Sequence, residues 1–96
     1  MKRVWKYVLE GENPCVSLPK GARIKHVDAQ DDKLCAWAEI MDSEIYNLEY
    51  RRFWVAPTGS QVPDNYEHIG TVLSETSIAS GRRRGALVVH VYEMMP

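Results

Sequence analysis

Arginine is the residue type whose pattern most clearly suggests chemistry in this chain. The sequence GRRRG places Arg82, Arg83 and Arg84 between two glycines, and Arg51 and Arg52 form a second basic pair. A guanidinium group offers a planar fork of donors that matches the oxygens of a phosphate, and it is almost never buried without a partner. The triple-arginine segment is therefore either a phosphate clamp or a solvated loop tip that hinders aggregation.

Aromatic residues are the second candidate group, with three tryptophans and five tyrosines in the chain. Their simplest role is to help fill a small core. On an open sheet face, however, they can stack on a nucleobase, which contributes about 1–3 kcal/mol per base, and an adjacent arginine is the usual companion. A ligand site of this kind would use Arg51, Arg52, Trp54, Thr58, Asp64, His68, Arg82, Arg83 and Arg84.

No residue spacing in the chain matches a catalytic or metal-binding motif. His26, His68 and His90 are too far apart for a local metal site, although His68 and His90 could face each other across the last hairpin. The serines lack a G-x-S-x-G elbow, and PTGS lacks the glycine spacing of a P-loop. We therefore expect a non-enzymatic protein without metal or cofactor. Cys15 and Cys35, without a CxxC or zinc spacing, are expected to be free thiols.

Composition excludes several classes of function. The chain has 96 residues, 45% hydrophobic and 26% charged, which predicts one globular domain spanning residues 1–96. A formal net charge of −1 argues against a binder of long nucleic acids, whose footprint is strongly basic. The apolar stretches are too short to span a bilayer. Because the first residues lack the apolar stretch of a signal peptide, we expect a cytoplasmic location.

Short segments rich in Val, Ile, Tyr and Trp, separated by Gly, Pro, Asn and Asp, are the pattern of an all-β domain. Residues 22–41 are predicted to form a hairpin with Asp31 and Asp32 at its tip, and its second arm, apolar on both faces, should be a central strand. The final segments YEHIGTVLSE and GALVVHVYE should pair as a hairpin. Their connection, TSIASGRRR, is longer than usual.

The stretch DSEIYNLEYRRFWV is ambiguous between helix and strand, especially over residues 43–53. Tyr46, Tyr50, Phe53 and Trp54 fall at helical spacing. The same residues also alternate and are rich in aromatics. We therefore favour an irregular loop to about residue 47, followed by a strand to about residue 56. The segment PTGSQVPDN should be an ordered surface loop.

Together these elements predict an all-β fold, a small barrel or sandwich of six to seven mostly antiparallel strands with little helix. Because so few strands can leave a sheet edge open, we also expect a homo-oligomer with symmetric interfaces. The predicted core comprises Trp5, Ile24, Leu34, Trp37, Ile40, Phe53, Ile69, Val72, Leu87, Val89 and Val91.

Six blocks, in this order along the chain, carry a resemblance to a known family: WKY, PKGARIKHVDAQ, LCAWAEI, RRFWVAPTGSQVPD, HIGTV and VVHVYE. With them the chain resembles a family of small uncharacterised phage and prophage proteins, expected to be β-rich. The chain departs from that family in its expanded connection SETSIASGRRRG. The resemblance implies a phage gene product acting in the bacterial cytoplasm.

From this context we expect a phage accessory, counter-defence protein that sequesters a small phosphorylated ligand such as a cyclic nucleotide signal. The alternative is a protein-binding inhibitor of a host defence complex, with the acidic turns or the basic loop as its contact surface.

Overall fold

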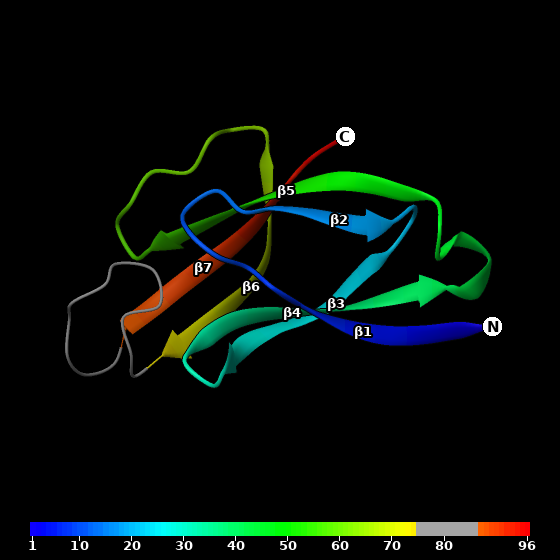
Figure 1. Cartoon of the computed structure of the whole chain (residues 1–96). Helices are drawn as coiled ribbons and strands as arrows, with labels where there is room; N and C mark the ends of the chain where they lie inside the picture. The colour runs from blue at the N-terminus through cyan, green and yellow to red at the C-terminus, as the bar shows by residue number, and fades with distance from the viewer. Residues whose placement is uncertain (75–86) are drawn as a thin grey trace.

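Two antiparallel β-sheets make up the computed structural model, which describes residues 1–74 and 87–96 (Figure 1). The predicted clamp residues Arg82, Arg83 and Arg84 lie outside the described residues. The strands found in the described part are β1 (Lys2–Val8), β2 (Cys15–Pro19), β3 (Arg23–Gln30), β4 (Lys33–Met41), β5 (Leu48–Pro57), β6 (Tyr66–Ser74) and β7 (Leu87–Met94). A short 3-10 turn, η1, spans Asp42–Glu44. The predicted all-β fold with little helix is confirmed.

The first sheet has the strand order β1-β4-β3. β3 and β4 form the expected hairpin, and Asp31 and Asp32 at its tip both have positive φ, 53° and 64°. Two consecutive residues with positive φ are what a type I′ hairpin turn requires, and aspartate tolerates this conformation. β4 is the central strand, as its apolar residues on both faces predict.

The second sheet has the order β2-β5-β7-β6. The ambiguous stretch forms η1 and then β5, which confirms the loop followed by a strand. Tyr50 points to solvent, whereas Phe53 and Val55 are buried, so the alternation of a strand prevails over the helical spacing of the aromatics. β6 and β7 pair antiparallel, as expected for the last hairpin.

Residues from both sheets meet in one hydrophobic core. Of the predicted core residues, six are buried and two pack partly buried against them: Leu34, Ile40, Phe53, Val72, Val89 and Val91, and then Ile24 and Ile69. The side chain of Leu87 lies outside the described residues. The structure shows no helix, within the described residues, that is long and apolar enough to span a membrane.

The three tryptophans do not fill the core, so that part of the prediction is wrong. Trp37 and Trp54 are half-buried, and Trp5 is exposed on the edge strand β1. The reason is strand alternation: Trp37 lies on the opposite face of β4 from Ala36 and Ala38, which are buried between the sheets. Phe53 and aliphatic side chains occupy the interior, and the indoles are left at the outer faces and the edge.

The regular pairing of β6 with β7 is interrupted once, by a register shift in β6 between His68 and Gly70. Gly70 faces the other sheet at very close range: a Cβ built there would lie 2.2 Å from Cγ2 of Val27 in β3. No side chain larger than hydrogen fits at this position. The bulge and the glycine therefore belong to the contact between β6 and β3.

Candidate functional site

The outer face of the β6–β7 hairpin carries two histidines and a threonine side by side. Thr71 lies directly opposite His90, and His68 lies opposite Tyr92. In a regular strand, residues 68 and 71 would point to opposite faces. The bulge at Ile69 adds the extra residue that brings both onto the same face. The expected juxtaposition of His68 and His90 is confirmed, with ring centroids 6.4 Å apart.

Four side chains on this face form a continuous line of hydrogen bonds, which we call the hydroxyl–imidazole chain. His68 Nε2 lies 2.8 Å from Thr71 Oγ1, which lies 3.1 Å from His90 Nδ1. His90 Nε2 lies 2.9 Å from Oγ1 of Thr58. Thr58 is held there because its backbone N–H donates to the carbonyl of Val88 in β7, at 3.3 Å. The chain thus joins the loop after β5 to the last hairpin.

A neutral imidazole has one donor and one acceptor, and each hydroxyl has one donor, so four donors serve three hydrogen bonds and one is left over. In one arrangement His68 Nε2–H donates to Thr71, Thr71 to His90 Nδ1, and His90 Nε2–H to Thr58. The hydroxyl hydrogen of Thr58 then points outward. In the reverse arrangement the donors run from Thr58 to His68, and Nδ1–H of His68 is the outward donor. In a third arrangement Thr71 accepts from both rings and keeps its own hydrogen, so in each case one donor is left over for a ligand.

Aromatic rings flank the hydroxyl–imidazole chain. Tyr92 packs edge-on against His68, with ring centroids 5.3 Å apart. Trp54 in β5 is directly opposite Tyr92 and meets Tyr66 edge-on at 5.7 Å. The indole Nε1 of Trp54 is buried and finds no hydrogen-bond partner among the described residues. Trp54, Thr58 and His68, three residues predicted for a ligand site, therefore lie in one region of the sheet.

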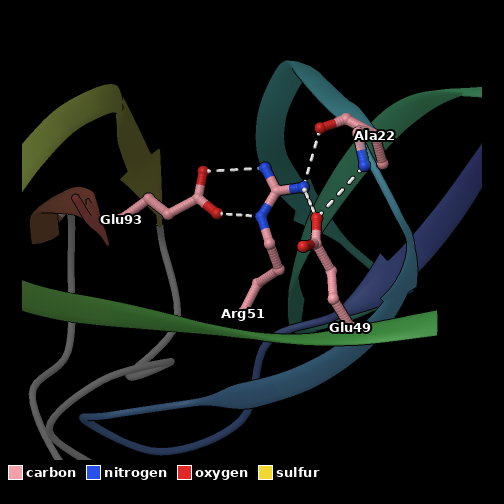
Figure 2. Close-up of polar contacts among 5 residues, drawn as sticks. Ala22, Glu49, Arg51 and Glu93 are labelled. Carbon is pink, nitrogen blue, oxygen red and sulfur yellow. Dashed lines mark hydrogen bonds and ion pairs between the residues drawn. The ribbon is translucent and has the colours of Figure 1, made fainter. Parts of the chain in front are cut away.

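Arg51 has a different environment, on the face of β5 that also carries Phe53. Its Nε and Nη2 donate to both carboxylate oxygens of Glu93, and Nη1 donates to the backbone carbonyl of Ala22 at 2.8 Å (Figure 2). Nη1 also lies 3.4 Å from Glu49, whose carboxylate accepts the backbone N–H of Gly21 at 3.1 Å.

The hydrogen bond to Glu93 raises the pKa of Arg51, against the opposing effect of its partial burial. Ala22 directly precedes β3 in the first sheet, whereas Glu93 is in β7 of the second. The guanidinium of Arg51 therefore ties the two sheets together, and most of its donors are engaged inside the protein.

Arg52 points to the opposite side of β5 and is exposed. It lines an open hollow of about 430 Å³ beside the C-terminal residues, together with three carboxylates, Glu49, Glu67 and Glu93. These carboxylates balance the two arginines, so the hollow is not an electropositive site. Asp64 is exposed in the loop between β5 and β6. Of the predicted arginines that the structure describes, Arg51 faces away from Trp54, whereas Arg52 lies on the same face of β5 as Trp54.

Thr71, His90 and Tyr92 complete the site but were not among the predicted site residues. The alternation of the final hairpin indicated that His90 could face His68, but Thr71 could not be placed without the bulge. Within the described residues, no three His, Cys, Asp or Glu side chains gather as a metal site would need. Cys15 and Cys35 are both free, as expected.

Fold and site together define a small protein of two antiparallel β-sheets with a polar, aromatic-flanked outer face. Its chain belongs to the family described as a domain of unknown function (DUF7352), whose model matches residues 1–96. No curated protein and no solved structure matches the chain.

Proposed function

We propose that this protein binds a small phosphorylated ligand on the outer face of the four-stranded sheet, without transforming it. The observation that carries the proposal is the hydroxyl–imidazole chain, in which four neutral groups with one donor each make three hydrogen bonds and leave one donor over. Among the described residues, the side-chain hydrogen bonds of this chain run between hydroxyl and imidazole groups. Phosphate oxygens are acceptors, so an unspent donor on an accessible face is the feature that they require.

Charge on the two sides of the sheet supports this assignment. Glu67 and Glu93 lie opposite each other in β6 and β7, and strand alternation puts them on the other face from His68 and Tyr92. The anionic groups nearest in sequence are thereby directed away from the hydroxyl–imidazole chain. A phosphate approaching the outer face would not meet them.

The segment with Arg82, Arg83 and Arg84 is a further part of the proposal. It connects Ser74 to Leu87, and the residue after Leu87, Val88, holds Thr58 through its carbonyl. The arginines are thus joined by covalent connectivity to the strands of the site. If they contribute to binding, replacing all three by alanine will lower affinity and flatten its salt dependence, because charged contacts are screened by ions.

The resemblance to phage proteins leads us to propose a cyclic nucleotide signal as the ligand and its sequestration in the bacterial cytoplasm as the purpose. Tyr92 offers an aromatic ring beside the hydroxyl–imidazole chain, and a nucleobase could stack near a phosphate bound there.

Binding is tested by titrating a panel of cyclic mono- and dinucleotides into the protein in a calorimeter. His90→Asn interrupts the hydroxyl–imidazole chain between Thr71 and Thr58, so it should displace the donor that binds the ligand and weaken the affinity about tenfold or more. His26→Asn is the matched control, since His26 is an exposed histidine on the other sheet. Equal loss in both variants, or no binding to any nucleotide, would contradict the proposal. Chromatography of the recovered nucleotide should show it unchanged.

A second candidate function, inhibition of a host protein, is favoured by a different surface. Tyr46, Leu48 and Tyr50 are all largely exposed within five residues at the start of β5. Exposed tyrosines grouped with an aliphatic side chain are typical of the centre of a protein interface. A Tyr46→Ser/Tyr50→Ser variant that loses counter-defence activity in cells while keeping nucleotide affinity would favour this function.

A further inference from the structure

β1 is the strand that buries least of its surface. It pairs with β4 on one side, and within the described residues its other edge has no strand partner. Val4 is 54% exposed, and Trp5 and Val8 are each 38% exposed. Apolar side chains are thus open to solvent on both faces of one edge strand. Such an edge is a template for pairing with another strand.

The backbone groups that face this open edge can be identified from the ends of the strand. The N–H of Leu9 donates to the carbonyl of Leu34, and the carbonyl of Met1 accepts from the N–H of Asp42. Because both groups of a residue point to the same side in an antiparallel ladder, the odd-numbered residues bond to β4. The backbone groups of Lys2, Val4, Lys6 and Val8 therefore face outward.

We propose that β1 pairs antiparallel with β1 of a second copy of this chain, about a two-fold axis through Trp5. In this register Lys2 lies opposite Val8 of the partner subunit, and Val4 opposite Lys6 of the partner subunit. These four residues are the ones whose backbone N–H and C=O groups face the open edge. In this register they can therefore form the hydrogen bonds between the two strands. The two three-stranded sheets become one continuous six-stranded sheet.

The side chains of β1 are complementary to themselves in this register. On one face each lysine meets a valine, so no two lysines are directly opposed. On the other face Trp5 meets the partner's Trp5, and Arg3 meets Tyr7 of the partner subunit. Aromatic pairs and cation–aromatic pairs between facing residues both stabilise antiparallel strands.

The lysines also select against the neighbouring registers that keep the same hydrogen-bonding phase. Centring the pair on Val4 would place Lys2 against Lys6 of the partner subunit, and centring it on Lys6 would oppose two lysines directly. Like charges directly opposite destabilise a sheet. Repulsion in the proposed register is reduced further because Lys2 and Arg3 are already paired within the chain, with Glu39 at 3.8 Å and Asp42 at 2.7 Å.

Sedimentation equilibrium of the full chain tests the proposal. An edge interface of seven residues is small, so we expect a reversible dimer of twice 11.0 kDa, which dissociates on dilution between about 500 and 10 µM. Val4→Lys opposes lysines across the axis and should weaken dimerisation at least tenfold. The control Leu73→Lys adds the same charge to an exposed apolar position in β6. A monomer at every concentration, or equal effects of the two variants, would overturn the proposal.

Cysteine cross-linking tests the register independently of the charge variants. Residues facing each other without hydrogen bonds have Cα atoms about 4.5 Å apart, which a disulfide can bridge. In a Cys15→Ser background, Trp5→Cys should therefore give a covalent dimer on mild oxidation. Tyr7→Cys in the same background should not cross-link. In this register residue 7 lies opposite residue 3 of the partner subunit, so the two introduced cysteines are four residues apart along the strands. Cross-linking of both variants alike, or of neither, would refute this register, and circular dichroism would verify that each variant is folded.

Discussion

Two polar clusters lie on opposite faces of the same sheet and use their hydrogen-bonding groups in opposite ways. Arg51 has most of its donors engaged with Glu93, Glu49 and a backbone carbonyl. Within residues 1–74 and 87–96, the side chains of the hydroxyl–imidazole chain bond to one another, and their four donors exceed the three hydrogen bonds by one. A group already saturated inside the protein stabilises the fold, whereas an unsaturated one can bind.

The comparison shows why the type of residue did not predict its role. Arginine is the usual phosphate ligand, but a guanidinium that is mostly withdrawn from water must be compensated by the protein itself. The side chain of Arg51 is only 18% exposed, and its partners come from both sheets. Histidine and threonine on an exposed face have no such requirement, so they remain available.

The largest effect on stability is expected from replacing Arg51, most of whose donors are engaged within the protein. Arg51→Ala leaves Glu93 partly buried without its counter-charge and removes the link to Ala22, and should lower the free energy of unfolding by about 3 kcal/mol. The adjacent Arg52→Ala is the matched control. Because Arg52 is exposed, its replacement should lower the free energy of unfolding by less than about 0.5 kcal/mol. Urea denaturation measures both, and similar losses in the two variants would remove the distinction between structural and free arginines.

The next largest effect on stability is expected at Gly70. It packs against Val27 on the inner face and adjoins the bulge that places His68 and Thr71 on the outer face. Gly70→Ala forces a methyl group against Val27 and should destabilise the fold by about 2 kcal/mol. It should also move the bulge and therefore shift the NMR signals of the His68 and His90 rings. Combining Gly70→Ala with Val27→Ala should show a favourable coupling in a double-mutant cycle, since the second change removes the colliding atom. Additive costs would contradict the steric explanation.

A smaller effect on stability is expected in the hydroxyl–imidazole chain. Thr71→Val interrupts the hydroxyl–imidazole chain at its middle but leaves the exposed face otherwise unchanged, so the free energy of unfolding should change by less than about 0.5 kcal/mol. Affinity for the phosphorylated ligand should nevertheless fall about tenfold. If stability fell as much as in Arg51→Ala, the chain would be a structural element like the arginine cluster.

The smallest effect belongs to an exposed counterpart of the Arg51 pair. Arg3, with a side chain 52% exposed, donates to Asp42, and this hydrogen bond lowers the pKa of the carboxyl group. The stabilisation is therefore complete above the ordinary pKa of aspartate and is lost as the pH falls through the lowered pKa. Melting temperatures of the parent and Arg3→Gln should differ slightly at pH 7 and converge as the pH falls through the lowered pKa of Asp42. A difference that grew on acidification would disprove the assignment.

Much of the fold was predictable because its signals are local. The alternation in β5, the two aspartates at the tip of the β3–β4 hairpin and the apolar residues on both faces of β4 each act within a few residues of chain. Backbone geometry translates such patterns directly into strands and turns. The location of His68 and His90 on one face of the last hairpin was accessible for the same reason, since a hairpin relates its two arms by simple alternation.

The sequence by itself thus determined the strands, the turns and the hairpin arms that carry the facing histidines, but the tertiary structure decided which groups are engaged and which are free. Arg51 finds its partners 29 and 42 residues away, and no local pattern indicates a contact of that range. Trp37 and Trp54 lie outward, and Trp5 lies at the sheet edge, because the faces that pack together were settled by the meeting of the two sheets. Thr71 joins His68 only through the bulge beside Gly70, where β6 passes too close to Val27 for any side chain. Which face of a strand is buried depends on what packs against it, and that is a property of the whole fold.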